Sequence, residues 1–276
     1  MTLLNKILFS DTTLSKFNSI TKYPSILTYH NLGDRGSLID SLVEDKRFDN
    51  KPVFVTEKID GTNTRLILFT DASGKIEDYL IGSREDFLYA CGDRIINPAL
   101  NIVKNMKSVA DLIETFNYNK LKGNSIYCIY GETYGGKINN AKQYSCHGNT
   151  SIRIFDFFTI TNESVENLLE LSSNSLSNWR EEGNQPFANI DELKEFCKTF
   201  HLTTVPFIKV IKGNEIPLTL QEVWNWMQQF RNSNAIIDDS GIGLAEGIVV
   251  RYADRSFIRK IRFEDYKRTK NMGLIT

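Results

Sequence analysis

The chain has 276 residues, of which 24% are charged and 41% are hydrophobic, ordinary values that argue against general disorder. A chain of this length can bury a core without disulfides or structural metal. Its 33 Lys and Arg nearly balance its 34 Asp and Glu, giving a net charge of −1, so a polyanionic partner would need a local basic patch.

The first half of the chain alternates helical, turn and strand signals. Helical spacing predicts helices at residues 14–20, 98–105 and onward from a Ser108 cap. Runs of β-branched and aromatic residues predict strands at 53–56, 65–70 and 79–82. The turn residues Asp60 and Gly61 make the first two strands either a hairpin or a sharp bend.

The second half repeats this order. Strands are predicted at 126–130, 152–158, 247–252 and 257–262. Between them lie helical segments at 165–171, 191–200 and 223–227. The last helix follows a capping box of Thr219 and Glu222. Blocks of strands separated by blocks of helices predict an α+β fold with largely antiparallel sheets.

The segment 57–63 (EKIDGTN) holds the first candidate for chemistry. A strand delivers Lys58 into a turn at Asp60 and Gly61, where glycine allows another group to approach closely. A lysine can act as a nucleophile there if neighbouring cations or desolvation lower the pKa of its amine. Taken alone, this short pattern is more often an exposed hairpin lysine.

Two further segments combine a polar or aromatic residue with a strand. In 130–136 (YGETYGG), Glu132 closes an apolar strand beside glycines and can bind sugar hydroxyls, or is simply a solvated strand end. In 155–158 (FDFF), Phe155 can stack on a base, whereas Phe157 and Phe158 are expected in the core.

The last two segments add a carboxylate and a basic strand. Glu246 enters the buried strand of 246–250. Strand alternation places Lys260 and Arg262 on one face and Arg259 on the other. Two cations on one face suit a phosphate chain, and the alternative is a basic edge strand that resists aggregation.

The order of these segments resembles that of the covalent nucleotidyltransferases, which are polynucleotide ligases and mRNA capping enzymes. The resemblance spans residues 52–263. Asn63 stands where DNA ligases usually have Arg, and 82–84 (GSR) and 22–26 (KYPSI) are also similar to the nick-sealing phage type of RNA ligase. The resemblance implies a nucleotidyltransferase domain of mainly antiparallel sheets flanked by helices, with the active site between the sheets.

The resemblance also implies four residues that act on phosphates. Lys58 would attack the α-phosphate of ATP and carry AMP, while Lys260 would contact that phosphate and help to lower the lysine pKa. Glu246 would act through Mg²⁺ or Mn²⁺, by way of water. Arg262 stands where lysine is commoner and would bind cofactor phosphate with a different geometry.

Five further residues would contact the nucleotide or the RNA. Glu57 and Phe155 would lie at the adenine, and Glu132 at the ribose. Asn63 and Arg84 would orient phosphates and the RNA end. The implied product is an RNA 5′-phosphate joined to a 3′-hydroxyl, as in RNA repair. The alternatives are a DNA-nick ligase, a capping-type guanylyltransferase and a non-catalytic RNA-binding module.

For the organisation of the chain, we expect residues 1–51 to pack on or lead into a catalytic domain at 52–276. Residues 263–276 are too few for a C-terminal OB-fold or other accessory domain. We expect a monomer, with a partner protein as one possible source of additional RNA-binding function. Trp224 and Trp226 lie on a helical pattern, and packing is the expected role of both.

The location of the protein is predicted from its cysteines and its amino-terminal segment. Cys91, Cys128, Cys146 and Cys197 form no CxxC pair and are expected to be buried or inert thiols of a reducing compartment. Cys146 and His147 have no second pair at ligand spacing, so no metal site is expected there. The sequence shows no signal peptide and no long apolar run, which predicts a cytoplasmic protein without a membrane partner.

Overall fold

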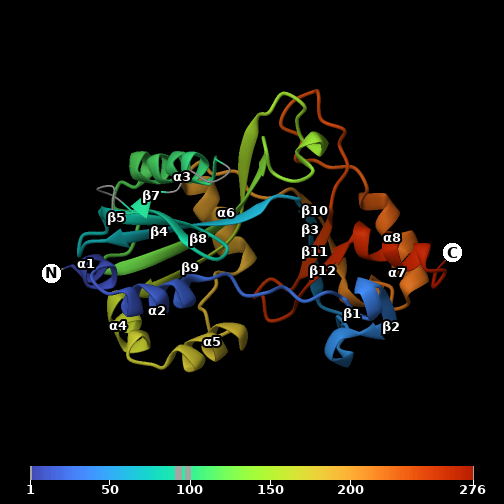
Figure 1. Cartoon of the computed structure of the whole chain (residues 1–276), viewed down its shortest axis with the longest axis horizontal. Coiled ribbons are helices and arrows are strands. Elements are labelled where there is room, and N and C mark those ends of the chain that lie inside the picture. Colours follow the sequence, from blue (N-terminus) through green and yellow to red (C-terminus); the bar gives the residue numbers. More distant parts are fainter. Residues whose placement is uncertain (1, 91–94, 97–100, 276) are drawn as a thin grey trace. The chain divides into compact units, whose positions relative to one another are not determined.

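The computed structural model describes residues 2–90, 95–96 and 101–275. The chain forms two compact units, each assembled from separate stretches of sequence (Figure 1). Unit 1 comprises Met1–Ser25, Thr62–Thr133 and Thr150–Thr204, and unit 2 comprises Ile26–Gly61, Tyr134–Asn149 and Val205–Thr276. Residues 1–51 are therefore divided between the two units.

Unit 1 is built on a six-stranded sheet in the order β7-β6-β5-β4-β8-β9. Its strands are β4 (Thr62–Thr70), β5 (Ile76–Ser83), β6 (Phe87–Ala90), β7 (Ile95–Ile96), β8 (Ser125–Gly135) and β9 (Thr150–Thr161). Pairing from β7 through β8 is antiparallel. Buried residues line both faces of β4, one of the two middle strands, because helices cover the sheet on two sides (Figure 1).

Among the described residues, unit 1 has six α-helices. They are α1 (Leu3–Leu8), α2 (Asp11–Thr21), α3 (Ile102–Phe116), α4 (Asn162–Leu169), α5 (Ser173–Glu181) and α6 (Ile190–Thr199). Figure 1 shows α3 on one side of the sheet and α2 with α4 on the other. The side chains of Ser10, Thr161, Ser172 and Asn189 each accept a hydrogen bond from the backbone of the helix that follows, which sets where those helices begin.

Unit 2 contains an antiparallel four-stranded sheet in the order β10-β3-β11-β12. Its elements are β1 (His30–Leu32), β2 (Leu38–Leu42), β3 (Pro52–Lys58), β10 (Phe207–Lys212), β11 (Gly247–Arg251), β12 (Ile258–Arg262), α7 (Leu220–Met227) and α8 (Phe263–Asn271). Short 3-10 turns lie at Asp34–Gly36, Val43–Asp45, Gly213–Glu215 and Gln228–Phe230, and at Ala141–Gln143. Val55, Val250 and Ile261 of the sheet join Val223 of α7 and Tyr266 of α8 in one buried core.

The structure confirms the predicted α+β class and its antiparallel sheets. The predicted capping box is also confirmed, because the Thr219 side chain accepts from the backbone of Glu222 and the Glu222 side chain accepts from the backbone of Thr219. The prediction that Ser108 caps a separate helix was wrong. Ser108 lies inside α3, where its hydroxyl donates to the carbonyl of Lys104. Residues 98–100 of the predicted helix at 98–105 lie outside the described residues.

The hairpin reading of the first two predicted strands was also wrong. β3 pairs in the sheet of unit 2 and β4 in that of unit 1, so Asp60 and Gly61 form the sharp bend that was its alternative. Cys128 and Cys197 are buried as expected, whereas Cys146 is exposed, and Cys91 lies outside the described residues. Within the described parts of the chain, every helix is too short or too polar to cross a membrane.

Candidate active site

Lys58 is the last residue of β3, and the sheet places it next to the start of β11. Its register partner is Gly247, so the preceding Glu246 lies beside it. The Lys58 Nζ is 2.5 Å from Glu246 Oε2, and these side chains are 25% and 14% exposed. Burial raises the pKa of Glu246, although the charge of Lys58 acts in the opposite direction. The predicted nucleophile and the predicted metal carboxylate thus form one contact.

Gly247 allows three strands to meet tightly at this point. It pairs with Lys58 on one side and with Arg262 of β12 on the other. A Cβ at Gly247 would lie 2.1 Å from the carbonyl oxygen of Ile261, so a side chain here would clash with the neighbouring backbone. Glycine therefore keeps Lys58 and Arg262 in one row across the sheet.

The basic strand has the predicted alternation, with Lys260 and Arg262 half-buried and Arg259 buried. The Arg262 guanidinium donates through Nε and Nη2 to the Asp265 carboxylate, at 2.9 and 2.8 Å. Burial acts to lower the pKa of Arg262, but the bonds and charge of Asp265 outweigh it, so the pKa lies above its usual value. Arg262 is thereby tied to the first turn of α8.

Glu57 lies next to the candidate nucleophile but is only 2% exposed. Its carboxylate accepts hydrogen bonds from the Ser233 hydroxyl at 2.5 Å and from the Asn234 N–H at 2.7 Å. Its own N–H donates to the carbonyl of Pro206. In this structure Glu57 therefore fastens the segment that follows Phe230 to strand β3.

The turn after Lys58 is clamped by two residues that the sequence analysis did not identify. The N–H of Asp60 donates to the Tyr144 hydroxyl at 2.7 Å, and Asn140 Nδ2 donates to the Asp60 carboxylate. Tyr144 is fully buried and packs edge-on against Tyr134, with ring centroids 4.8 Å apart. No spacing rule links residue 60 to residue 144, so only the folded chain shows this clamp.

The other predicted site residues belong to unit 1. Asn63 on β4 and Glu132 on β8 are register partners, and Glu132 lies inside β8, which continues beyond it to Gly135. Among the described residues, the buried Oδ1 of Asn63 has no hydrogen-bond partner, which leaves an acceptor for a ligand. Arg84 is exposed in the turn after β5.

Phe155 is half-buried on β9, and its ring lies edge-on to Tyr23 with centroids 5.0 Å apart. Phe157 and Phe158 are buried, which confirms their predicted place in the core. The predicted site residues thus fall into two sets, one in each unit. That both sets line one active site between the sheets stays a prediction.

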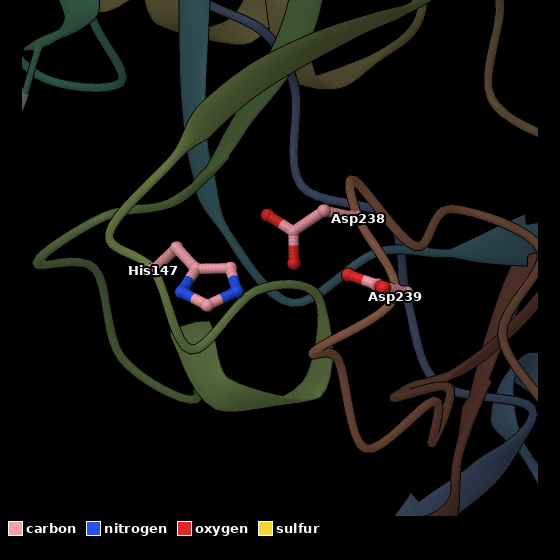
Figure 2. A group of neighbouring side chains, drawn as sticks. All are labelled: His147, Asp238 and Asp239. Atoms are coloured by element: carbon pink, nitrogen blue, oxygen red, sulfur yellow. The ribbon is translucent and has the colours of Figure 1, made fainter.

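His147, Asp238 and Asp239 form a cluster in unit 2 that sequence spacing did not reveal (Figure 2). One ligand atom from each lies within 4.8 Å of the others. However, Asp238 Oδ2 accepts from Ser145 Oγ at 2.6 Å and Asn149 Nδ2 at 2.8 Å, and Oδ1 accepts from the N–H and hydroxyl of Ser240. Because a carboxylate has about four acceptor positions, Asp238 is saturated and joins two loops instead of offering a lone pair to a metal.

Comparison with known families shows to which family this chain belongs. The family model described as RNA ligase matches residues 51–270. The chain belongs to the RNA ligase family. This is a family of ATP-dependent polynucleotide ligases, and the match confirms the family-level part of the resemblance described above. No curated protein matches the chain.

Solved structures of the Naegleria gruberi RNA ligase share this RNA ligase fold. The complex with PPi has a TM-score of 0.51 and 14% identity, and the match covers 90% of this chain and 64% of that one. Two variants with ATP and Mn give TM-scores of 0.51 and 0.50, identities of 12% and 13%, and coverage of 91% and 90% of this chain and 63% of each of theirs. This chain therefore spans less than two thirds of their length, and at these identities the likeness is one of fold.

Proposed function

We propose that the protein is an ATP-dependent RNA ligase of the nick-sealing type, which joins an RNA 5′-phosphate to a 3′-hydroxyl. The observation that carries this proposal is the contact of 2.5 Å between Lys58 Nζ and Glu246 Oε2 in a chain of the RNA ligase family. This contact joins the amine at the end of β3 to a half-buried carboxylate that lies 188 residues further along the chain.

In the first step, the Lys58 amine loses a proton and attacks the α-phosphorus of ATP. A P–N bond forms, the bond to the β-phosphate oxygen breaks, and pyrophosphate leaves. Arg262 lies in the same row of the sheet as Lys58, and Lys260 is on the same face of β12 as Arg262, so both place positive charge where phosphate charge develops.

Two exchanges complete the reaction. An oxygen of the RNA 5′-phosphate attacks the phosphorus of the lysyl-AMP, and the P–N bond breaks to give RNA carrying AMP on its 5′ end. The 3′-hydroxyl then loses its proton and attacks the 5′-phosphorus, so that a phosphodiester forms and AMP leaves.

Glu246 also fits a hard divalent cation, because Mg²⁺ and Mn²⁺ take carboxylate oxygens and keep several waters. Glu246 lines a cavity of about 360 Å³, which has room for such a partly hydrated ion. When bound, the ion would offset phosphate charge. The binding of ATP with Mn and of PPi by the Naegleria gruberi ligase structures agrees with this cofactor pair.

The decisive experiment is transfer of label from [α-³²P]ATP with Mg²⁺ to the protein. We expect acid-labile, alkali-stable label, as for a P–N bond, on the wild type and none on Lys58→Ala, because the acceptor nitrogen is gone. Lys120→Ala, which changes an exposed lysine, is the matched control and keeps full label. Label that survives Lys58→Ala, or label from GTP instead of ATP, contradicts the proposal. RNA binding by a wild type that takes no label would indicate a non-catalytic module.

A nick-sealing panel tests the choice of substrate. Nicked duplexes that carry RNA or DNA on the 3′-hydroxyl side are offered together with single-stranded RNA ends. We expect sealing of the duplex with RNA on the 3′-hydroxyl side and slower sealing of the all-DNA nick. Equal or faster sealing of the all-DNA nick would favour a DNA ligase.

A further inference from the structure

Unit 2 contains a cavity of about 360 Å³ beside the Lys58 contact. Its wall includes Glu246, which binds Lys58, and Asp60 of the clamped turn. The rest of the wall comes from α7, α8 and the loops around Asn140 and Leu244. The cavity therefore adjoins the place where the lysyl-AMP bond would form.

Two cations in the wall are available to an anion. Arg231 and Lys267 are exposed, and among the residues that the structure describes neither forms an ion pair. Two of the three acids in the wall have cationic partners, since Glu246 binds Lys58 and Glu264 binds Arg268. Asp60 accepts from the neutral amide of Asn140 and keeps its charge, so Arg231 and Lys267 leave one net positive charge in the wall. The free positive charge suits a phosphate group.

The same wall offers an aromatic ring and an amide. Trp224 is half-buried, packs on the core of unit 2, and lies edge-on to Phe263 with ring centroids 6.5 Å apart. Gln143 accepts from the Leu244 N–H through Oε1, which fixes its side chain and leaves its NH₂ group as a donor. A base can stack on an indole ring, and an amide can bind a base edge.

The wall is held in place by its own hydrogen bonds. The N–H groups of Ile242 and Gly243 donate to the carbonyls of Lys142 and Gln143, and Asp238 joins the same two loops. A cavity with fixed walls loses little conformational entropy when a ligand binds.

We propose that this cavity binds the terminal nucleotide on the 3′-hydroxyl side of the RNA break, with its base on Trp224 and its phosphate at Arg231 and Lys267. The inference rests on the proposed function. In that reaction AMP is attached at Lys58 and then at the 5′ end, so the remaining reactant is the 3′-hydroxyl strand. Its hydroxyl must reach the position that the Lys58–Glu246 contact borders.

The test isolates the last step by supplying pre-adenylylated RNA donor and a 3′-hydroxyl acceptor strand. For Arg231→Ala/Lys267→Ala we expect the KM for the acceptor to rise about tenfold or more, because two charge-assisted contacts are lost. Labelling by ATP should stay within about twofold of wild type. Lys120→Ala/Lys198→Ala removes two exposed lysines of unit 1 and is the matched control.

Two variants of Trp224 distinguish a loss of ring stacking from a loss of folding. Trp224→Phe should keep most acceptor binding, whereas Trp224→Ala should raise the KM for the acceptor with kcat little changed. An unchanged acceptor KM in the double variant overturns the inference. A rise in the KM for ATP with loss of label also overturns it, because the cavity would then serve the β- and γ-phosphates of ATP.

Failure of the proposed function gives a different result, namely a wild type that takes no label from ATP. Fluorescence anisotropy with a short labelled RNA that ends in a 3′-hydroxyl then tests the cavity directly. Equal affinity of the wild type and the double variant in that assay contradicts the inference, and weaker binding by the variant supports it.

Discussion

Arg65 of unit 1 and Lys58 of unit 2 both place a cation in a β-sheet, but their surroundings differ. Arg65 is fully buried, and its Nη1 donates to the Asn18 carbonyl at 3.0 Å and to Thr21 Oγ1 at 3.1 Å. Burial lowers the pKa of Arg65 to about 10. Lys58 is a quarter exposed and binds a carboxylate at the edge of a cavity.

This difference is the basis for predicting a structural role for Arg65 and a reactive role for Lys58. The partners of Arg65 are neutral groups of α2, so its bonds hold a helix against the sheet. The partner of Lys58 is one carboxylate, which a phosphate can replace at the lysine, and a metal cation can replace the lysine at the carboxylate. We therefore expect substitutions around Lys58 to change activity and substitutions around Arg65 to change stability.

The largest expected effect on activity is at Glu246, the partner of Lys58 in unit 2. Glu246→Ala should lower the rate of labelling by ATP about 100-fold or more, because an electrostatic group at the reacting phosphate is lost. Initial rates of labelling with Mg²⁺ measure the effect. Glu163→Ala, which removes an exposed carboxylate of unit 1, should leave the rate unchanged. Equal labelling rates for the wild type and Glu246→Ala would contradict the expectation that substitutions around Lys58 change activity.

The next prediction tests whether Arg65 of unit 1 contributes to stability. Arg65→Met should lower the free energy of unfolding by about 3 kcal/mol, because it leaves buried acceptors of α2 without donors. Urea denaturation measures the loss, and Lys75→Met at an exposed position is the control. Labelling per folded molecule should remain. A stable variant that has lost labelling would reverse the assignment of the two cations.

A smaller effect is expected at Glu57, which neighbours Lys58 but is buried like Arg65. Glu57→Gln should lower the free energy of unfolding by about 2 kcal/mol, because its carboxylate accepts from both Ser233 and Asn234 and an amide NH₂ cannot accept. Chemical denaturation of the variant and the wild type gives this difference. An unchanged free energy of unfolding would contradict a structural role for Glu57 and favour a role in the reaction.

The smallest effect concerns Asp238 and depends on pH. Hydrogen bonds from Ser145, Ser240 and Asn149 hold the pKa of Asp238 well below its usual 3.8. A carboxyl pKa that is lower in the folded state stabilises the protein at pH values above the usual pKa of 3.8. This contribution is lost as the pH falls from that value through the folded pKa. Asp238→Asn should therefore be less stable than wild type by equal amounts at pH 7 and pH 5, and by less at pH 3. A difference that grows on acidification would contradict this assignment.

Much of the fold was predictable from local patterns. The β-branched runs gave the predicted strands, and side-chain caps marked several helix starts. β10 was missed because it is an edge strand in which Lys209 and Lys212 interrupt the apolar run at every third residue, a spacing that differs from strand alternation. Helix α8 was missed because it is mostly charged and buries few apolar side chains, Tyr266 among them.

The sequence by itself determined the chemistry of this protein's motifs: a lysine before a turn, a carboxylate before a buried strand and a basic strand, in the order of a ligase. Residue type and strand alternation depend on near neighbours, so they can be read directly. Only the tertiary structure decided that Lys58 contacts Glu246, that Tyr144 clamps Asp60, and that Trp224, Arg231 and Lys267 line one cavity. Those contacts depend on sheet register and loop closure, which join residues that are far apart in the chain.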